Sequence, residues 1–260
     1  MVSLHFPFFL QFGEFRLHPH FVFESLAYTM GFLLYRRLRA RYGDAIPAGT
    51  RWSVTVAAIF GAAVGSKLLF LLEQPALTIA NIRDAGYLLG GKTIVGGLIG
   101  ATLCVELAKW VVGEHRRTGD LFAVPLCFGI AIGRVGCFLT GLSDQTCGSA
   151  TTLPWGVDFG DGVTRHPTQL YELLFVLVLG IYLWSEMGRP HAEGLLFRQF
   201  IVGYMGFRLL VDFIKPDSRY FGLSSIQWAC VAVLVWYGFQ FRRTPGKRTG
   251  SEGVAQVART

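Results

Sequence analysis

The sequence predicts an all-α integral membrane protein, a polytopic bundle of about seven transmembrane helices. Hydrophobic residues make up 52% of the 260 residues and charged residues only 16%, whereas a soluble domain is usually nearer a quarter charged. The mean hydropathy is +0.44. The apolar runs approach the roughly 20 residues that a helix needs to cross a bilayer, while a soluble protein with a large core would show shorter or amphipathic runs.

Apolar length defines seven candidate spans along the chain. In order they are residues 21–35, 52–72, 93–112, 121–141, 167–187, 193–214 and 223–241. The first span is short, and the third carries the charged residues Glu106 and Lys109. These two therefore fit the pattern of a transmembrane helix less well than the other five. The abundant Phe (22) and Gly (32) are typical of helices that face lipid and pack closely.

The Lys and Arg residues between the spans predict the orientation. The connections and tail on one side hold Arg36, Arg37, Arg39, Arg41, Arg51, Arg116, Arg117, Arg189, Arg242, Arg243, Lys247, Arg248 and Arg259. Those on the other side hold Arg16, Arg83, Lys92, Arg165, Lys215 and Arg219. This bias places the N-terminus in the periplasm and the C-terminus in the cytoplasm. The net charge of +7 is therefore a signal of topology and of contact with the lipid bilayer, and we expect no nucleic-acid partner.

Two regions follow from this pattern. Residues 1–241 form one seven-helix membrane domain, and residues 242–260 form a short basic cytoplasmic tail of polar and small residues. We expect that tail to be disordered.

Several ionisable residues fall inside the predicted spans, where an ionised group costs at least about 2.5–3.5 kcal/mol without a partner or a wet cavity. They are Glu24, Lys67, Glu106, Lys109, Arg134, Glu172, Arg198, Arg208 and Asp212. Lys109 and Arg198 lie near predicted cytoplasmic ends, from which their side chains can reach the interface. The others need an explanation inside the bundle.

Arg134 and Arg208 are the strongest candidates for a functional site. Arg208 follows Tyr204 by one turn and precedes Asp212 by one turn, so a structural Arg208–Asp212 pair is one interpretation. The other is a cationic site, because a guanidinium matches a phosphate with two parallel hydrogen bonds and desolvation strengthens the attraction. A phosphate-bearing lipid is the anion available at that depth.

Two further stretches carry candidate binding residues. LLGGKTIVGGLIG opens the third span with many glycines; either they let helices pack closely, or Gly96, Gly97 and the nearby Lys92 approach a headgroup. TRHPTQLYE brings polar residues to the outer start of the fifth span, with Pro167 suited to its first turn. Its candidates are Arg165, His166, Gln169, Tyr171 and Glu172.

Together the segments AIGRVGCFLTG, VTRHPTQLYELL, VGGLIGA and GYMGFRLLVDFIKPD resemble the prolipoprotein diacylglyceryl transferase family over about residues 15–240. RHPTQLYE is the most specific of them. The resemblance implies an enzyme of the bacterial inner membrane. Such an enzyme moves the diacylglyceryl group of phosphatidylglycerol to the lipobox cysteine thiol of a preprolipoprotein, forming a thioether and releasing glycerol phosphate.

The resemblance also implies site residues. Arg134 matches the arginine that holds the phosphate of phosphatidylglycerol, and Arg208, with Tyr204 before it, matches the arginine assigned to catalysis. The RHPTQLYE residues match a family motif. The paired arginines make chemical sense, because the departing glycerol phosphate gains negative charge in the transition state.

The sequence departs from the family pattern at four positions. Val95 replaces the histidine that is a favoured general base, and Glu24 replaces a tyrosine of the first span. In the signature around Arg134, Cys137 replaces an asparagine and Leu142 replaces a glutamate. Valine cannot accept a proton, so Glu24, Glu172 or His166 is left for that role. Cys137 and Cys147 both fall near the outer face, where a disulfide and free thiols are both compatible with the sequence.

Three functional hypotheses remain from the sequence. The first is the diacylglyceryl transferase; the second is a divergent paralogue that keeps the phospholipid site but uses another acceptor. The third is a non-enzymatic transport or lipid-binding membrane protein. No spacing such as CxxC or HExxH is present, so the sequence predicts no metal and no cofactor.

Overall fold

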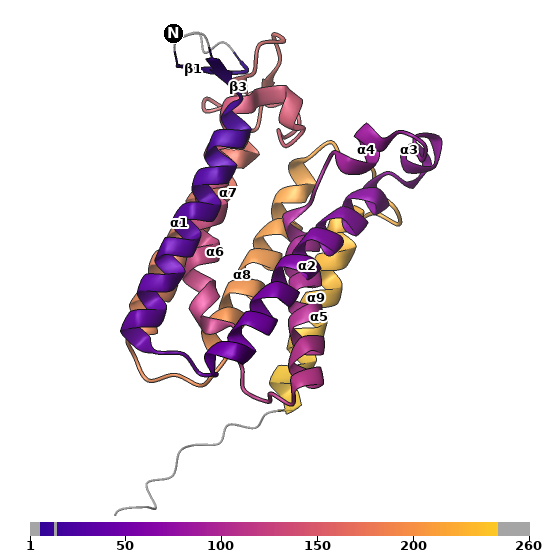
Figure 1. Ribbon diagram of the computed structural model, residues 1–260. Helices are drawn as coiled ribbons and strands as arrows, with labels where there is room; N and C mark the ends of the chain where they lie inside the picture. The colour runs from indigo at the N-terminus through magenta and orange to yellow at the C-terminus, as the bar shows by residue number, and fades with distance from the viewer. Residues whose placement is uncertain (1–5, 13–14, 244–260) are drawn as a thin grey trace, which may run out of the picture.

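A single helical bundle makes up most of the computed structural model, which describes residues 6–12 and 15–243 (Figure 1). Its long helices are α1 (Pro19–Tyr42), α2 (Ala48–Glu73), α5 (Ile94–Val112), α6 (Asp120–Thr140), α7 (Thr168–Met187), α8 (Leu195–Val211) and α9 (Ser225–Arg243). Each overlaps one of the predicted spans. Residues 244–260 of the predicted tail lie outside the described residues.

Four of the described helices are long and apolar enough to cross a membrane by length and composition. They are α2, α5, α7, and α6 taken together with the 3-10 helix η1, residues Asp120–Asp144. The helix α8 has 17 residues, and α1 and α9 end in arginines. The apolar helices mark the chain as a helical membrane protein.

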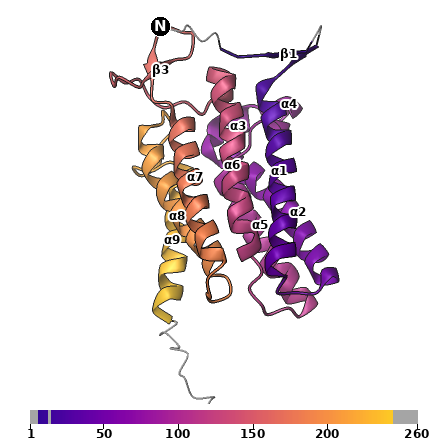
Figure 2. The same cartoon turned by 90° about the vertical axis from the view of Figure 1, so that its left-hand side faces the viewer.

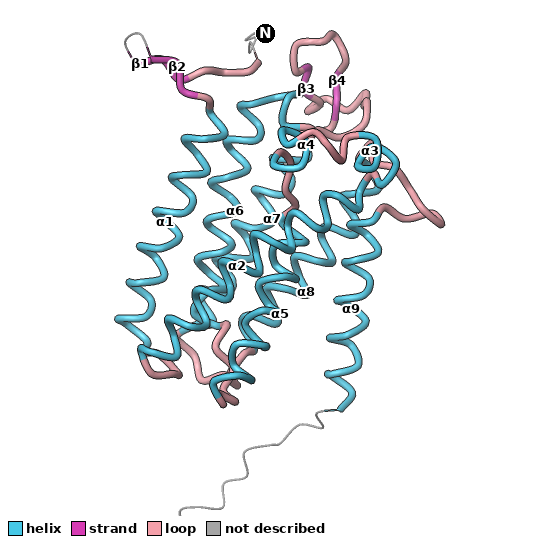
Figure 3. Tube along the Cα trace, turned by 45° about the vertical axis from the view of Figure 1, so that its right-hand side comes forward, coloured by secondary structure: helices cyan, strands magenta, loops and turns pink. Residues whose placement is uncertain are grey.

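The short elements gather at one end of the bundle (Figure 3). They are the strands β1 (Leu10–Phe12), β2 (Phe15–Leu17), β3 (Val157–Asp158) and β4 (Thr164–Arg165), and the short helices α3 (Pro75–Ala80), α4 (Ala85–Leu89), η1 (Gly141–Asp144) and η2 (Asp212–Ile214). The strands form two antiparallel pairs, with Leu10 opposite Leu17 and Val157 opposite Arg165. The fold is all-α as predicted, although the sequence did not predict these two small hairpins.

The long helices pack as neighbours in a definite order. Helix α6 packs against α1 and α7, and α2 packs against α5, as Figures 1 and 2 show from two directions. Helix α8 contacts α6, α7 and α9, and α9 also touches α2 and α5. Helix α8 therefore joins the α1–α6–α7 group to the α2–α5–α9 group.

Local sequence signals set several helix ends. Helix α5 begins after Thr93, whose side chain accepts a hydrogen bond from the amide of Gly96, and it ends at Gly113, which has a left-handed backbone. Asp120 of α6 accepts hydrogen bonds from the amides of Gly194 and Phe197, at 2.6 and 3.0 Å, and so caps the start of α8.

The hydrophobic core lies along α6, α7 and α8. Val124, Val176, Leu183, Phe200 and Met205 are buried there. Large apolar side chains also cover the outside of the bundle, among them Trp52, Phe60, Trp110, Val178 and Trp236. An apolar exterior of this extent suits contact with lipid.

Helix α1 is the clearest departure among the predicted spans. It begins at Pro19 and continues to Tyr42, whereas the sequence predicted a span over residues 21–35. The cluster of arginines after residue 35 therefore belongs to its last two turns and not to a loop. Apolar length alone ends a predicted span at the first charges, but a helix can extend beyond the hydrocarbon into the headgroup region.

Candidate active site

Two buried arginines share one buried glutamate between α6, α7 and α8, towards the end of the bundle that carries the hairpins. Arg134 of α6 places Nη2 2.9 Å from Oε1 of Glu172, and Arg208 of α8 places Nη1 3.0 Å from Oε2 of the same carboxylate. Only 7%, 4% and 2% of Arg134, Arg208 and Glu172 are exposed. One carboxylate on α7 thus connects the arginines of two other helices.

Tyr204 and Asp212 complete this cluster on the side of α8. The fully buried hydroxyl of Tyr204 donates to Oε1 of Glu172 at 2.7 Å. Asp212, at the start of η2, places Oδ1 2.8 Å from Nη2 of Arg208. The Arg208–Asp212 pair that the sequence allowed is therefore present, but Arg208 contacts Glu172 as well.

Both arginines keep a buried donor that has no hydrogen-bond partner among residues 6–12 and 15–243. The Nε groups of Arg134 and Arg208 are buried, and within the described part of the chain neither has a hydrogen-bond partner. Nη1 of Arg134 lies 3.7 Å from the thiol of Cys137, a weak acceptor. A buried N–H without a hydrogen-bond partner costs free energy. These N–H groups are therefore suited to donate hydrogen bonds to the oxygen atoms of an anion.

The RHPTQLYE residues divide between this cluster and the outer surface. Glu172 lies in the cluster, and Gln169, one turn earlier, is buried with Nε2 3.3 Å from Sγ of Cys147. Nδ1 of His166 lies 3.2 Å from the hydroxyl of Tyr171, which also accepts a hydrogen bond from the indole of Trp155. This segment therefore contributes the carboxylate of Glu172 to the buried cluster, and the rings of His166 and Tyr171 to the outer surface.

Arg165 lies outside the bundle on β4, where Nη1 is 2.6 Å from Oδ1 of Asp161. The hydrogen bond from Arg165 lowers the pKa of Asp161, and the same contact raises the pKa of Arg165. Among the described residues, the hydrogen bonds and ion pair of Arg165 are with Asp161 and Val163 and not with the buried cluster. Its role in substrate binding stays a prediction.

Lys92 and Glu24 meet in an ion pair between two parts of the bundle. Lys92 precedes α5, and its ammonium contacts Oε1 of Glu24 on α1. Glu24 also accepts a hydrogen bond from the hydroxyl of Tyr28 at 3.0 Å and lies 3.5 Å from Nε2 of His20. These two sequence candidates are thus brought together, on the side of the bundle that carries α1.

The predicted binding glycines have different surroundings. A Cβ on Gly96 would lie 2.3 Å from the carbonyl oxygen of Gly65 on α2, so Gly96 serves a close approach of α2 and α5. A Cβ on Gly97 would meet nothing closer than 3.5 Å. Close helix packing therefore accounts for Gly96, whereas a headgroup contact at Gly97 stays a prediction.

Two of the positions at which the sequence departs from the family pattern, Val95 and Cys137, are buried, whereas the side chain of Glu24 is 28% exposed. Val95 is 1% exposed and belongs to the hydrophobic core, so it offers no proton acceptor. Cys137 and Cys147 are both free thiols. The sequence did not indicate that His20 and Asp144 lie beside Cys137, because residues so far apart in the chain form no recognisable spacing.

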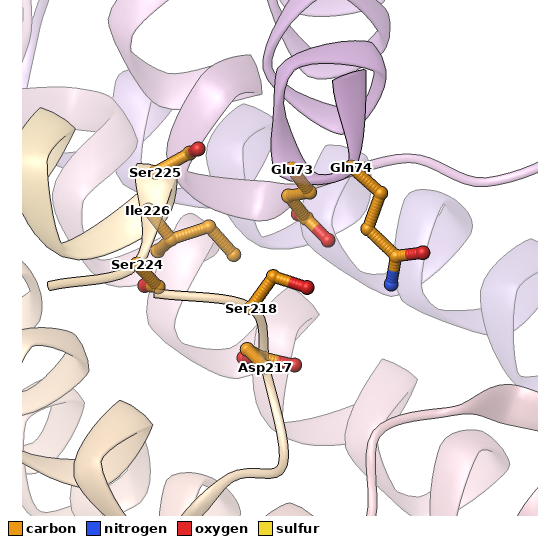
Figure 4. Close-up of a pocket in the computed structure, with 7 residues that line it drawn as sticks. All are labelled: Glu73, Gln74, Asp217, Ser218, Ser224, Ser225 and Ile226. Atoms are coloured by element: carbon orange, nitrogen blue, oxygen red, sulfur yellow. The ribbon is translucent and has the colours of Figure 1, made fainter. Parts of the chain in front are cut away.

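A small separate pocket lies between the end of α2 and the start of α9 (Figure 4). Glu73, Asp217 and Ser224 are among the residues that line it. Its volume of about 10 Å³ has room for about one water molecule, and a phospholipid headgroup would not fit. The arginine cluster is therefore the stronger candidate.

Comparison with known proteins agrees with the motifs that meet in this cluster. The family model for prolipoprotein diacylglyceryl transferase matches residues 7–241. Several relatives bear the name phosphatidylglycerol–prolipoprotein diacylglyceryl transferase. The protein from Bordetella parapertussis is 32% identical over 253 residues, which cover 88% of this chain and 91% of the relative.

The protein from Polynucleobacter asymbioticus is 31% identical over 255 residues (91% of this chain, 95% of the relative). That from Cupriavidus necator is 30% identical over 254 residues (85% and 89%). The match runs through every long helix that contributes to the arginine cluster. The chain belongs to the prolipoprotein diacylglyceryl transferase family.

Proposed function

We propose that this transferase moves the diacylglyceryl group of phosphatidylglycerol to the lipobox cysteine thiol of a preprolipoprotein. A thioether forms and glycerol phosphate is released. The observation that carries the proposal is the buried cluster of Arg134, Glu172 and Arg208, in a chain whose relatives are named for this reaction.

The phosphate of the donor lipid binds between Arg134 and Arg208. Two guanidinium groups face the single carboxylate of Glu172, and each keeps a buried Nε–H available. The phosphodiester oxygens would accept these donors, while Glu172 and Tyr204 hold the guanidinium planes in place. Burial strengthens this attraction, because little water is present to screen it.

The same arginines act in the chemical step. The acceptor thiol gives its proton to a base, its sulfur attacks the glyceryl carbon of the lipid as a thiolate, and the carbon–oxygen bond to the phosphate breaks. The electron pair of that bond stays on the phosphate oxygen, so negative charge grows where Arg134 and Arg208 can stabilise it. Tyr204 acts as a positioning residue, because its hydroxyl donates a hydrogen bond to Glu172, which contacts both arginines.

We place the protein in the bacterial inner membrane with seven crossings, a periplasmic N-terminus and a cytoplasmic C-terminus. The connections α1–α2, α5–α6 and α7–α8 lie together at the end opposite the hairpins (Figure 1). Arg116, Arg117 and Arg189 belong to that end. The short elements, with His166, Tyr171 and Trp155, then face the periplasm, from which the acceptor peptide arrives.

The departures at Val95 and Cys137 support one alternative, a paralogue that binds the same phospholipid but uses another acceptor. A transfer assay separates the two. Purified protein in detergent is incubated with phosphatidylglycerol and a lipobox peptide, and the mass of the peptide is followed. We expect a gain of one diacylglyceryl group, reduced at least about 100-fold by Arg134→Ala.

Arg189→Ala is the matched control, because Arg189 pairs with Glu186 at the other end of the bundle. It should retain the activity of the unmodified protein. A protein that binds phosphatidylglycerol in an Arg134-dependent manner yet never modifies the peptide would favour the paralogue. Equal activity in Arg134→Ala and Arg189→Ala would refute the phosphate-binding role.

A further inference from the structure

A second polar cluster lies at the outer end of α6, one turn from Arg134. It consists of His20 from the start of α1, Cys137 from the last turn of α6 and Asp144 from η1. One ligand atom of each residue lies within 4.8 Å of the other two. Nδ1 of His20 is 3.0 Å from Oδ1 of Asp144.

The fold brings these three residues together through two glycines. A Cβ on Gly136 would lie 2.7 Å from Cβ of Phe23 and 3.4 Å from Cα of His20, so the glycine allows α1 to approach α6 at this level. Gly141 ends α6 with a φ of 72° and turns the chain into η1, which carries Asp144 back towards Cys137.

Each of the three side chains has a supporting contact. Nε2 of His20 lies 3.5 Å from Glu24, Oδ2 of Asp144 accepts a hydrogen bond from Thr146 at 2.6 Å, and the thiol of Cys137 lies 3.7 Å from Nη1 of Arg134. A metal-binding histidine commonly ligates through one ring nitrogen and donates the other to a carboxylate, and bound carboxylates are themselves hydrogen-bonded. In this cluster the carboxylate of Glu24 lies near the second ring nitrogen of His20, and Asp144 accepts a hydrogen bond from Thr146.

We propose that His20, Cys137 and Asp144 form a binding site for a divalent ion of the Zn²⁺ class. Nitrogen, sulfur and oxygen donors together are typical of zinc and its neighbours, while Mg²⁺ and Ca²⁺ require oxygen alone. An ion pair between His20 and Asp144 would not require a thiol beside it. Three protein ligands leave a fourth tetrahedral position open, as in catalytic zinc sites.

The open position is suited to a thiolate, and this step rests on the proposed function. The acceptor cysteine gives its proton to a metal-bound hydroxide, which leaves as water, and its sulfur takes the vacated position as a thiolate. That sulfur then attacks the glyceryl carbon. The site would thus supply the deprotonation for which Val95 has no group, next to the arginine that holds the phosphate.

The side chains are accessible enough for this exchange. Cys137 is 8% exposed and the side chain of Asp144 9%, whereas the side chain of His20 is 33% exposed. Two ligands are therefore anchored within the protein and the third lies at an opening. A closed structural site would bury all of its ligands and use four of them.

Titration of the full-length protein in detergent with Co²⁺ tests the site without any transfer reaction. Co²⁺ replaces Zn²⁺ and gives a thiolate-to-metal absorption band. We expect the band with about one ion per chain, its loss in Cys137→Ser, and affinity at least about 100-fold lower in His20→Ala and Asp144→Asn.

Two matched controls should keep the band. Cys147→Ser removes the other buried thiol at this end, and His18→Ala removes an exposed histidine two residues from His20. Absence of the band in the unmodified protein, or an equal band in Cys137→Ser, would overturn the metal site.

A transfer assay on Zn²⁺-loaded and chelator-treated protein then separates the two proposals. Transfer that falls at least about 10-fold on metal removal and returns with Zn²⁺ supports the thiolate role. Equal transfer in both samples overturns that role and leaves the proposed function intact. Cobalt binding without any transfer by the loaded protein supports the metal site and refutes the proposed function.

Discussion

Glu172 supplies a negative charge that both buried arginines share, because its carboxylate contacts Arg134, Arg208 and Tyr204 at once. Removing one partner from a buried ion pair leaves an uncompensated charge, which commonly costs about 3–5 kcal/mol. We therefore expect Glu172→Gln, which keeps the shape but not the charge, to lower the free energy of unfolding by about that amount. Thermal and denaturant unfolding in detergent would measure it.

Tyr204→Phe is the matched control for this prediction. It removes one hydrogen bond to the same carboxylate and keeps every charge, so its cost should be nearer 1–2 kcal/mol. Added phosphatidylglycerol should also stabilise Glu172→Gln more than the unmodified protein, because its phosphate would restore the missing negative charge. Equal losses in the two variants would show that the arginines do not depend on Glu172.

At the scale of single residues, the sequence indicated Arg134, Tyr204, Glu172 and Arg208 as site residues, and the structure brings all four together. It could not indicate that one carboxylate joins both arginines. That depends on how α6, α7 and α8 pack, and side chains on three helices leave no common spacing in the chain. Their catalytic roles stay predictions.

The clearest feature at the scale of elements is the contact between α2 and α5. Gly61 and Gly65 on α2 face Gly96 and Gly100 on α5, and a Cβ on Gly100 would lie 2.1 Å from the carbonyl oxygen of Gly61. Backbone atoms cannot yield as the end of a flexible side chain can. The two helices must move apart if a side chain is added here.

Gly100→Ala should therefore destabilise the protein by about 1–3 kcal/mol, the usual cost of overpacking. Gly97→Ala is the control on the same helix, because its added Cβ would meet only ordinary contacts at 3.5 and 3.6 Å. It should be neutral or slightly stabilising, since alanine favours a helix more than glycine does. Unfolding temperatures in detergent would compare the two. The packing interpretation is wrong if the variants melt alike.

The sequence predicted the long helices but not the short strands. Long apolar runs located every long helix to within a few residues, except at the C-terminal end of α1, because apolar length is the main determinant of a helix in a membrane. The hairpins β1–β2 and β3–β4 were missed. Strands of two or three residues are too short to show an alternating pattern, and pairing with the partner strand determines them.

For the whole molecule, the number of crossings decides on which side of the membrane each end lies. The four most apolar helices alone would give an even number and would place the segments before α2 and after α7 on the same side. Seven crossings place the hairpins and the end of α9 on opposite sides. The basic residues at the end opposite the hairpins favour seven, because such residues are retained in the cytoplasm.

Reporter fusions test this topology in cells. A fluorescent protein that matures only in the cytoplasm should fluoresce when fused after Arg243, at the end of α9. A phosphatase that is active only in the periplasm should be active when inserted between Gly160 and Gly162, an exposed turn with open space around both glycines. Exchanging the two reporters is the control and should silence both. If the phosphatase is active after Arg243, an even number of crossings holds, and the acceptor could not reach the arginine cluster from the side we propose.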